Sequence, residues 1–517
     1  MSRRELLRLA SAAAIATGGA GVLAGCGFGG DDESPRGSRT RTVKFGMSGA
    51  TTSADVADPA LSNTQHDGRL MTAAYEQLTR YDEGLQAVPW LAESWSANSR
   101  ADEWRFRLRS GVSFHDGKAM TAADVAYSFG RVLDEKTASP GASLLGFLDP
   151  DGIKVVDDHT ITFRLKESIG DLPLSLITKQ SYVVPDGATT ADLRRSAVGT
   201  GAFKLDDFTP GGDRTVFVKN DKYWGAGLPR ISGFELIPIP ETATRVAALQ
   251  RGQVDIIENV SATDIERLKG ANMLVQKQAK GDMELFAMQT DVAPFDDPRV
   301  RLALKYALNR EGMVDLVAQG QATVLNDIPI SSTLQYGLQD SPRALNVSKA
   351  KQLLADAGHR DGLSIELNTS DVQARFMDFA TVYKSMAADA GIELKLAVSP
   401  ADTYWEKVWL QTPAFVSAWI ARPAESMLAL LFVADSTSNE THWDRPDWER
   451  RFRQARASQN ETERQAMFAA LQQEVIDDGG YLSPYMANTI SATGPDVKGW
   501  MPSGTFFEDF SAISLGS

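Results

Sequence analysis

Strict alternation of apolar and charged side chains marks the clearest strand in this chain. In Trp104–Leu108, apolar residues occupy every second position and arginines occupy the positions between them. This period of two predicts a strand with one buried and one solvated face. Further along, Ile153–Val156 and Thr160–Leu165 flank the pair Asp157 and Asp158. Two β-rich runs around an acidic turn predict a β-hairpin.

Helices are predicted where the apolar period lengthens and a capping residue precedes it. Thr121 and Asp124 can cap a first turn reciprocally, and an apolar stripe with helical spacing follows from Val125 to Leu133. Asp297–Pro298 combines an N-cap with a proline at the first helical position. A third helix is predicted at Ala350–Ala357. Strand and helix signals therefore alternate, which predicts an α/β fold.

The N-terminus carries the pattern of an export signal. Arg3 and Arg4 precede a weakly apolar, Ala- and Gly-rich stretch, Leu6–Leu23, which is short for a permanent membrane span. Two adjacent arginines in this place are typical of a twin-arginine signal. The stretch ends before Cys26, the one cysteine of the chain, whose thiol is predicted to accept a lipid. The alternative is a buried or incidental cysteine. We expect residues 1–25 to be removed.

The chain after residue 25 has two parts of different composition. Residues 26–41 are rich in Gly, Ser and acidic side chains and predict a flexible tether. The rest is too long for a single core, so at least two domains are expected. The formal net charge of −14 argues against a nucleic-acid partner.

Catalytic and metal-binding signatures are missing from the sequence. Its five histidines form no His-x-x-x-His pair, the single cysteine cannot form a Cys pair, and no Gly-x-Ser-x-Gly motif occurs. Abundant carboxylates in an acidic chain are typical of solvated faces. We therefore expect neither an enzyme nor a resident metal or cofactor.

Motifs spread along most of the chain resemble those of the peptide, oligopeptide and nickel class, family 5, of extracytoplasmic solute-binding proteins of ABC importers. They occur in the same order as in that family. The matching segments are Tyr75–Leu78, Leu91–Trp95, Phe114–Gly117, Thr121–Ser128, Gly199–Phe203, Tyr223–Trp224, Gly252–Asp255, Phe295–Arg301 and Leu353–Gly358.

The resemblance implies a two-lobe periplasmic-binding-protein fold, type II, of the large class with an extra subdomain in lobe one. Lobe one is expected at 42–288 and 489–517, with the subdomain inserted at about 84–198, and lobe two at 289–488. Closure of the lobes would bury the solute and be recognised by permease subunits. We expect a lipid-anchored monomer at the extracytoplasmic face of the membrane.

The ligand prediction rests on a departure from the family. In its peptide binders, a Trp of lobe two is followed three residues later by an Asp that pairs with the ammonium group of the peptide. Here Trp419 is followed by Arg422. A guanidinium repels ammonium and pairs with carboxylate, phosphate or sulfonate. Arg422 is expected to bind an anionic group of the solute, to pair with Glu425 structurally, or to be solvated.

Aromatic residues near this segment complete the predicted site. Trp419, Tyr404 and Trp405 are expected to line the pocket together with Arg422 and Glu425, although a Trp pair such as Trp405 and Trp409 is more often core.

The resemblance leaves several functions open. The first candidate function is the capture of peptides or similarly sized solutes and their delivery to an ABC permease. The alternatives are an anionic or modified non-peptide solute, a chelated metal, and a peptide-sensing receptor or chaperone with the same fold.

Overall fold

A computed structural model describes residues 41–194, 196–373, 375–505 and 507–516. Residues Thr40–Ser517 form one compact unit. The predicted signal (1–25), Cys26 and all but the last residue of the predicted tether lie outside the described residues, so these remain predictions. Among the described residues, no helix combines the length and the apolarity that a membrane span requires.

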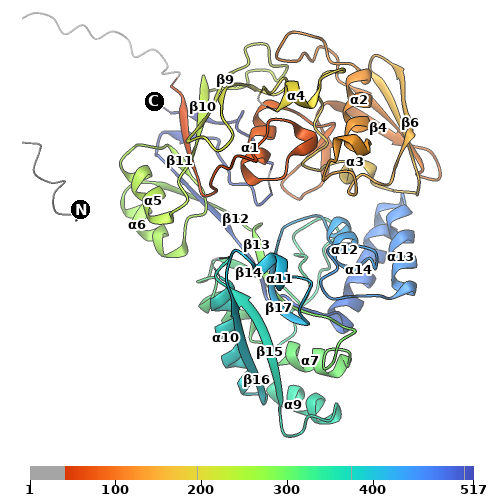
Figure 1. The fold of residues 1–517 in the computed structure, drawn as a ribbon, viewed down its shortest axis with the longest axis vertical. Helices are drawn as coiled ribbons and strands as arrows, with labels where there is room; N and C mark the ends of the chain where they lie inside the picture. The colour runs from red at the N-terminus through yellow and green to blue at the C-terminus, as the bar shows by residue number, and fades with distance from the viewer. Residues whose placement is uncertain (1–40, 195, 374, 506, 517) are drawn as a thin grey trace, which may run out of the picture. The chain divides into compact units, whose positions relative to one another are not determined.

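A seven-stranded mixed sheet organises the first part of this unit (Figure 1). Its first strand lies near the middle and pairs in parallel with two neighbours, whereas the other pairings are antiparallel. In spatial order the strands are β12 (Leu274–Gln278), β20 (Thr489–Thr493), β11 (Ile256–Ile257), β1 (Val43–Met47), β10 (Gly233–Pro238), β9 (Thr215–Lys219) and β8 (Phe203–Phe208). The helices of this part are α1 (Gln65–Ala74), α4 (Thr190–Leu193), α5 (Thr242–Gln250) and α6 (Ile265–Gly270).

A four-stranded antiparallel sheet with one long helix forms an insertion in this first part. Its strands are β4 (Ala92–Ala97), β5 (Glu103–Leu108), β7 (Thr160–Leu165) and β6 (Leu148–Asp157), accompanied by α2 (Ala122–Leu133) and α3 (Leu172–Ser175). A short hairpin, β2 (Thr79–Tyr81) and β3 (Ala87–Pro89), precedes it, and β21 (Val497–Lys498) pairs with β22 (Ser514–Leu515) near the C-terminus.

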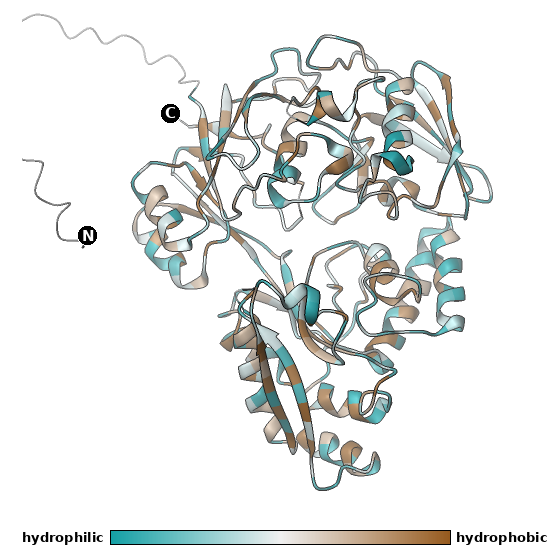
Figure 2. Ribbon diagram, viewed as in Figure 1, coloured by the Kyte–Doolittle hydropathy of each residue, from teal (hydrophilic) through white to brown (hydrophobic). Residues whose placement is uncertain are grey.

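A five-stranded sheet organises the second part. Its spatial order is β16 (Ile392–Ser399), β15 (Leu363–Ser370), β17 (Ala414–Ile420), β13 (Asp282–Met288) and β18 (Tyr481–Leu482), and β14 (Ala322–Val324) pairs separately with β19 (Tyr485–Ala487). The helices are α7 (Pro298–Tyr306), α8 (Arg310–Leu316), α9 (Val347–Asp356), α10 (Phe376–Ala388), α11 (Tyr404–Lys407), α12 (Ala424–Phe432), α13 (Pro446–Ala457) and α14 (Glu461–Asp478). Figure 2 shows apolar and polar residues in bands along β15 and β16.

We call the part built on the seven-stranded sheet lobe one and the part built on the five-stranded sheet lobe two. The chain passes from β12 to β13 and returns from β19 to β20, so it crosses between the lobes twice. The sequence placed the first boundary after Met288. Because β13 pairs with β17 and β18, residues Asp282–Met288 belong to the lobe-two sheet, and we propose that the crossing lies between Gln278 and Asp282.

Each part has a hydrophobic cluster of its own. The largest packs around the five-stranded sheet, two others flank the seven-stranded sheet, and a further one lies in the insertion. There α2 packs on its sheet through aromatic rings, with the Phe129 and Phe163 centroids 5.1 Å apart and those of Phe106 and Phe163 5.6 Å apart. Burying one such side chain stabilises the fold by about 1.5–3 kcal/mol.

The predicted elements are confirmed where the signals are local. The strand at Glu103–Leu108 alternates exposed and buried positions, and β6 and β7 form the predicted hairpin. The hairpin turns at Asp158 and His159, one residue later than expected, and β6 begins earlier than expected. The side chain of Asp297 accepts a hydrogen bond from the backbone N–H of Arg299 and caps α7.

Candidate functional site

A cavity of about 600 Å³ lies between the two lobes, and both contribute to its wall. Lobe one supplies the segment 174–180 beside α3 together with Tyr81 and Phe507. Lobe two supplies the end of β17, the first turns of α12, the segment 435–437 and one side chain of α13. Apolar, hydroxyl-bearing and charged side chains line the wall, which is typical of a pocket for a small polar organic molecule.

Arg422 reaches this cavity because the chain leaves β17 at Ile420 and enters α12 only at Ala424. Its guanidinium is half-buried, and its Nε atom has no hydrogen-bond partner among the described residues. No described carboxylate lies within ion-pair distance of it. Burial lowers the pKa of Arg422, with nearby Tyr81 acting in the opposite direction. The cavity therefore contains a cation whose charge the described residues do not balance.

A second cation lines the cavity from the opposite lobe. Lys179 follows the short segment after α3 and is half-buried. Burial and, to a smaller extent, the positive charge of Arg422 lower its pKa to about 8. Since the two cations disfavour each other, a negative group between them would be bound by both.

Glu425 also lines the cavity, but its charge is already compensated. Arg456 of α13 donates from Nε to its Oε1 at 2.9 Å, and the hydroxyl of Ser175 lies 3.4 Å from the same oxygen. Burial raises the pKa of Glu425, and Arg456 opposes that shift. The ion pair of Arg422 with Glu425 that the sequence offered as an alternative is not formed, because Glu425 points from the first turn of α12 toward α13.

The structure places the predicted aromatic residues outside this cavity. Tyr404 is fully buried in the lobe-two core, where its hydroxyl donates to the Val416 carbonyl at 2.6 Å. Trp405 is 40% exposed and packs against the rings of Tyr404 and Phe376. None of the predicted aromatics lines the cavity, so only Arg422 and Glu425 of the five predicted residues meet there.

Trp419 is half-buried at the end of β17, and its indole Nε1 has no hydrogen-bond partner among the described residues. Glu440 accepts hydrogen bonds from Trp409 Nε1 at 2.6 Å and Tyr481 OH at 2.9 Å, and Ser417 Oγ also donates to it. Burial raises the pKa of Glu440, whereas the donors Ser417, Trp409 and Tyr481 lower it. Ser417 of β17 is thus joined through Glu440 to Trp409 and Tyr481 in the lobe-two core.

Residues of lobe one are the part of the site that the sequence analysis missed. Lys179, Tyr81 and Phe507 come from three separate segments and share no sequence pattern. Phe507 follows Phe506 and precedes Phe510 by three positions, so nothing in the sequence distinguishes it from a core aromatic residue.

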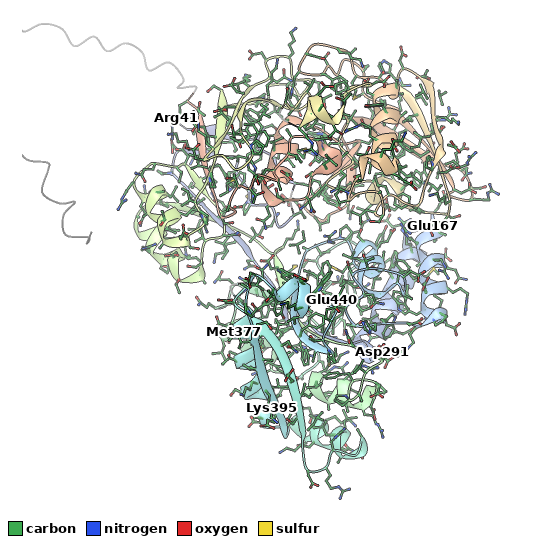
Figure 3. The ribbon with its side chains drawn as sticks, viewed as in Figure 1. Arg41, Glu167, Asp291, Met377, Lys395 and Glu440 are labelled. Atoms are coloured by element: carbon green, nitrogen blue, oxygen red, sulfur yellow. The ribbon has the colours of Figure 1, made fainter. Side chains whose placement is uncertain are left out.

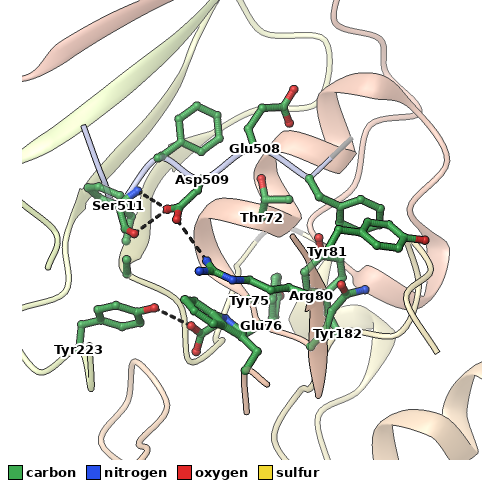
Figure 4. A pocket seen from close by; sticks show the side chains of 16 residues that line it. Thr72, Tyr75, Glu76, Arg80, Tyr81, Tyr182, Tyr223, Glu508, Asp509 and Ser511 are labelled. Atoms are coloured by element: carbon green, nitrogen blue, oxygen red, sulfur yellow. Dashed lines mark hydrogen bonds and ion pairs between the residues drawn. The ribbon is translucent and has the colours of Figure 1, made fainter. Parts of the chain in front are cut away.

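A smaller pocket of about 130 Å³ lies in lobe one and shares Tyr81 and Phe507 with the cavity (Figure 4). At its wall, Glu76 accepts hydrogen bonds from Tyr223 OH at 2.7 Å and from Thr200 Oγ1 and Trp224 Nε1, each at 2.8 Å. Burial raises the pKa of Glu76 to about 7. Since both carboxylate oxygens have donors, Glu76 joins segments of lobe one and is not available to a ligand.

One cluster has the residue types of a metal site. Asp55, His66 and Asp67 are buried with ligand atoms within 4.8 Å of one another. However, His66 Nδ1 lies 3.1 Å from Asp55 and Nε2 lies 3.0 Å from Thr215 Oγ1. Asp67 accepts hydrogen bonds from three backbone N–H groups, two just before α1 and one of the preceding loop at Val56. These hydrogen bonds account for the cluster as a structural cap.

Known proteins resemble the chain along most of its length. The family model "Bacterial extracellular solute-binding proteins, family 5 Middle" matches residues 86–440. The glutathione-binding protein GsiB of Pectobacterium atrosepticum is 24% identical over 474 residues, covering 87% of this chain and 91% of the relative.

Solved structures share the fold. The periplasmic binding protein DppA of Helicobacter pylori in complex with the peptide STSA has a TM-score of 0.77 at 23% identity, covering 92% of this chain and 98% of that one. AgaA of A. tumefaciens R10 in complex with agropinic acid has a TM-score of 0.77 at 24% identity, covering 92% and 99%. The expected two-lobe periplasmic-binding-protein fold is confirmed.

Members of this family are extracytoplasmic and bind solutes rather than transform them. The family model covers more than half of the chain, and the cavity between the lobes is where such a protein would hold a solute. The chain belongs to the bacterial extracellular solute-binding proteins of family 5 and is a solute-binding component of an ABC transporter.

Proposed function

We propose that this protein captures a solute with an anionic group in the cavity between its lobes and presents it to the permease. The observation that carries the proposal is Arg422, a half-buried guanidinium at the cavity wall with no carboxylate partner among the described residues. A carboxylate, phosphate or sulfonate of the solute would supply that partner.

The surroundings of Arg422 support a solute of moderate size. The cavity volume of about 600 Å³ lies within the range of small-molecule sites, and Lys179 adds a second positive charge. Apolar side chains such as Leu174, Ile177 and Phe507 line the same space and can cover a solute's carbon skeleton. A peptide bound through its terminal carboxylate, or a similar organic acid, satisfies both requirements.

The relatives support the same class. Their names and titles give glutathione, the peptide STSA and agropinic acid as ligands of those proteins. Glutathione and peptides carry carboxylates, and agropinic acid is an acid by its name. We extend to this chain the shared chemistry, an organic molecule with an acidic group, and not any one of these compounds.

Export and anchoring complete the proposed function. Arg3, Arg4 and Cys26 support transport across the membrane by the twin-arginine route and attachment through a lipid on the cysteine. A diacyl anchor holds firmly, so the two lobes would stay close to the permease. Replacement of Cys26 by Ser should release the protein from membranes in a fractionation experiment, and continued membrane retention would contradict the anchor.

The experiment compares matched acid and amide probes. Residues 40–517, which form one compact unit, are purified, and native mass spectrometry identifies any solute that remains bound. Trialanine, trialanine amide and glutathione are then tested by thermal shift and calorimetry. The proposal expects an acidic co-purified solute, or binding of trialanine at least tenfold tighter than of its amide. Equal affinity for acid and amide, with a neutral or cationic co-purified solute, would reject the anionic class.

A further inference from the structure

The two lobes also touch away from the two crossings of the chain, and one such contact lies at the edge of the insertion. The backbone N–H of Gly170, in the insertion of lobe one, donates to the carbonyl of Arg456 in lobe two at 2.7 Å. Arg456 Nη1 donates to Glu167 Oε1 at 2.7 Å, and Gln459 Nε2 donates to the carbonyl of Asn98 at 2.7 Å. Figure 3 shows Glu167 at the edge of the insertion that faces α13.

Gly170 can occupy this place only because it has no side chain. A Cβ atom there would lie 2.0 Å from the Ser458 carbonyl oxygen, 2.7 Å from the Ser458 carbonyl carbon and 2.8 Å from Arg464 Nη1. All three atoms belong to lobe two. Gly170 is not among the glycines with positive φ, so its own backbone would accept alanine. Lobe one alone does not need a glycine here, whereas contact between the lobes does.

Arg464 supports the same segment. Its Nη2 lies 3.6 Å from Asp171 Oδ2, and Tyr336 OH and Gln335 Nε2 lie 3.4 Å and 3.5 Å from that carboxylate. Burial raises the pKa of Asp171, and the positive charge of Arg464 lowers it. A carboxylate of lobe one is thus buried among polar groups of lobe two, and separation of the lobes would leave these groups to water.

Arg456 connects this contact to the cavity. Its Nε donates to cavity-lining Glu425 at 2.9 Å, while its Nη1 and carbonyl reach Glu167 and Gly170 of the other lobe. One side chain therefore joins the wall of the cavity to the facing lobe. A shift of the first turn of α12 on solute binding would act directly on the lobe contact.

We propose that Glu167 and Gly170 of lobe one with Arg456 and Ser458 of lobe two form a closure contact, and that Arg456 is its positioning residue. The contact holds the lobes together in the absence of solute, and Arg456 couples its geometry to Glu425 in the cavity. The closure contact itself does not depend on the proposed function, because its test uses no solute. Only the effect of closure on solute capture rests on that function.

The test measures the distance between the lobes. Cys26 is the one cysteine of the sequence, so cysteines introduced at exposed Lys154 in lobe one and Lys351 in lobe two are the only thiols in residues 40–517. Energy transfer between dyes on these cysteines reports the closed fraction of single molecules without solute. Gly170→Ala should shift at least half of the closed molecules to a longer distance.

Gly130→Ala is the matched control, because a Cβ at Gly130 in α2 meets nothing within 4 Å. Its distance distribution should equal that of the parent, and circular dichroism should be unchanged in both variants. A second variant, Glu167→Gln, removes only the ion pair and should open fewer molecules than Gly170→Ala. A parent without a closed population, or equal distributions for Gly170→Ala and Gly130→Ala, would overturn the closure contact.

Discussion

Two ends of one cavity carry an arginine each, and the structure treats the two charges differently. At one end, Arg456 pairs with Glu425 at 2.9 Å and with Glu167 at 2.7 Å. At the other, Arg422 has no ion pair among the described residues and lies near Lys179. The difference teaches that a positive residue in a cavity marks a ligand site only where the protein itself leaves the charge unbalanced.

Replacement of Arg456 tests the end of the cavity where the arginine is paired with Glu425, and it has the largest expected effect on stability. Arg456→Ala leaves Glu425 buried without its cation, so the free energy of unfolding should fall by about 3 kcal/mol. Urea denaturation measures this loss. Adding Glu425→Gln to Arg456→Ala should recover part of it, because the buried charge is then gone.

Arg451 on the same helix provides the control for that loss. It pairs with Glu474 at the surface, and Arg451→Ala should cost no more than about 1 kcal/mol. If the two alanine variants are equally stable, the pairing of Arg456 with Glu425 does not stabilise the protein, and the contrast between the two ends fails.

The pH dependence of solute binding tests the end of the cavity at Arg422, because Lys179 nearby can lose its charge. Burial and Arg422 lower its pKa to about 8, so it loses its charge as the pH rises from 7 to 9. Affinity for an acidic solute should fall over this interval by up to about tenfold for each unit by which the solute raises the pKa of Lys179. Calorimetry from pH 6.5 to 9.5 measures it. Lys179→Met should abolish the pH dependence, and an unchanged dependence in that variant would exclude Lys179 as its source.

The smallest expected effect is the pH dependence of stability that the buried carboxyl of Glu508 in lobe one contributes. Burial raises its pKa to about 7 from 4.5, with Arg69 acting against the shift. A carboxyl with a raised folded pKa binds more protons in the native state, so its contribution to stability is complete below pH 4.5 and is lost as the pH passes 7. The parent should therefore lose about 1.3 kcal/mol more than Glu508→Gln between pH 6 and pH 8. Parallel melting curves across this range would contradict the shift.

The sequence predicted individual strands and helices because the interactions that form them lie between residues close together in the chain. The alternation at Trp104–Leu108 and the cap at Asp297 depend on neighbours within one strand or one turn, and both are confirmed. The order of the lobes came from family resemblance. The pairing of β13 could not be read from its residues, because the partner strands lie far along the chain.

The site was predicted only in part for the same reason. Arg422 stood out because it replaces an expected carboxylate, and it does line the cavity. Tyr404 and Trp405 were chosen by closeness in sequence, yet the chain turns them into the core and onto the surface of lobe two. Lys179 and Phe507 face Arg422 only after the two lobes come together, which no local pattern encodes.

The most direct measurement compares the affinity of three proteins for the acidic solute identified by mass spectrometry or by the acid and amide probes. Arg109→Ala removes a half-buried arginine outside the cavity and serves as the control. Arg422→Ala should lower the affinity at least tenfold relative to the parent while the melting temperature stays nearly unchanged, and Arg109→Ala should leave the affinity as it is. Equal affinity of the parent and Arg422→Ala would contradict the claim that Arg422 binds the anionic group of the solute.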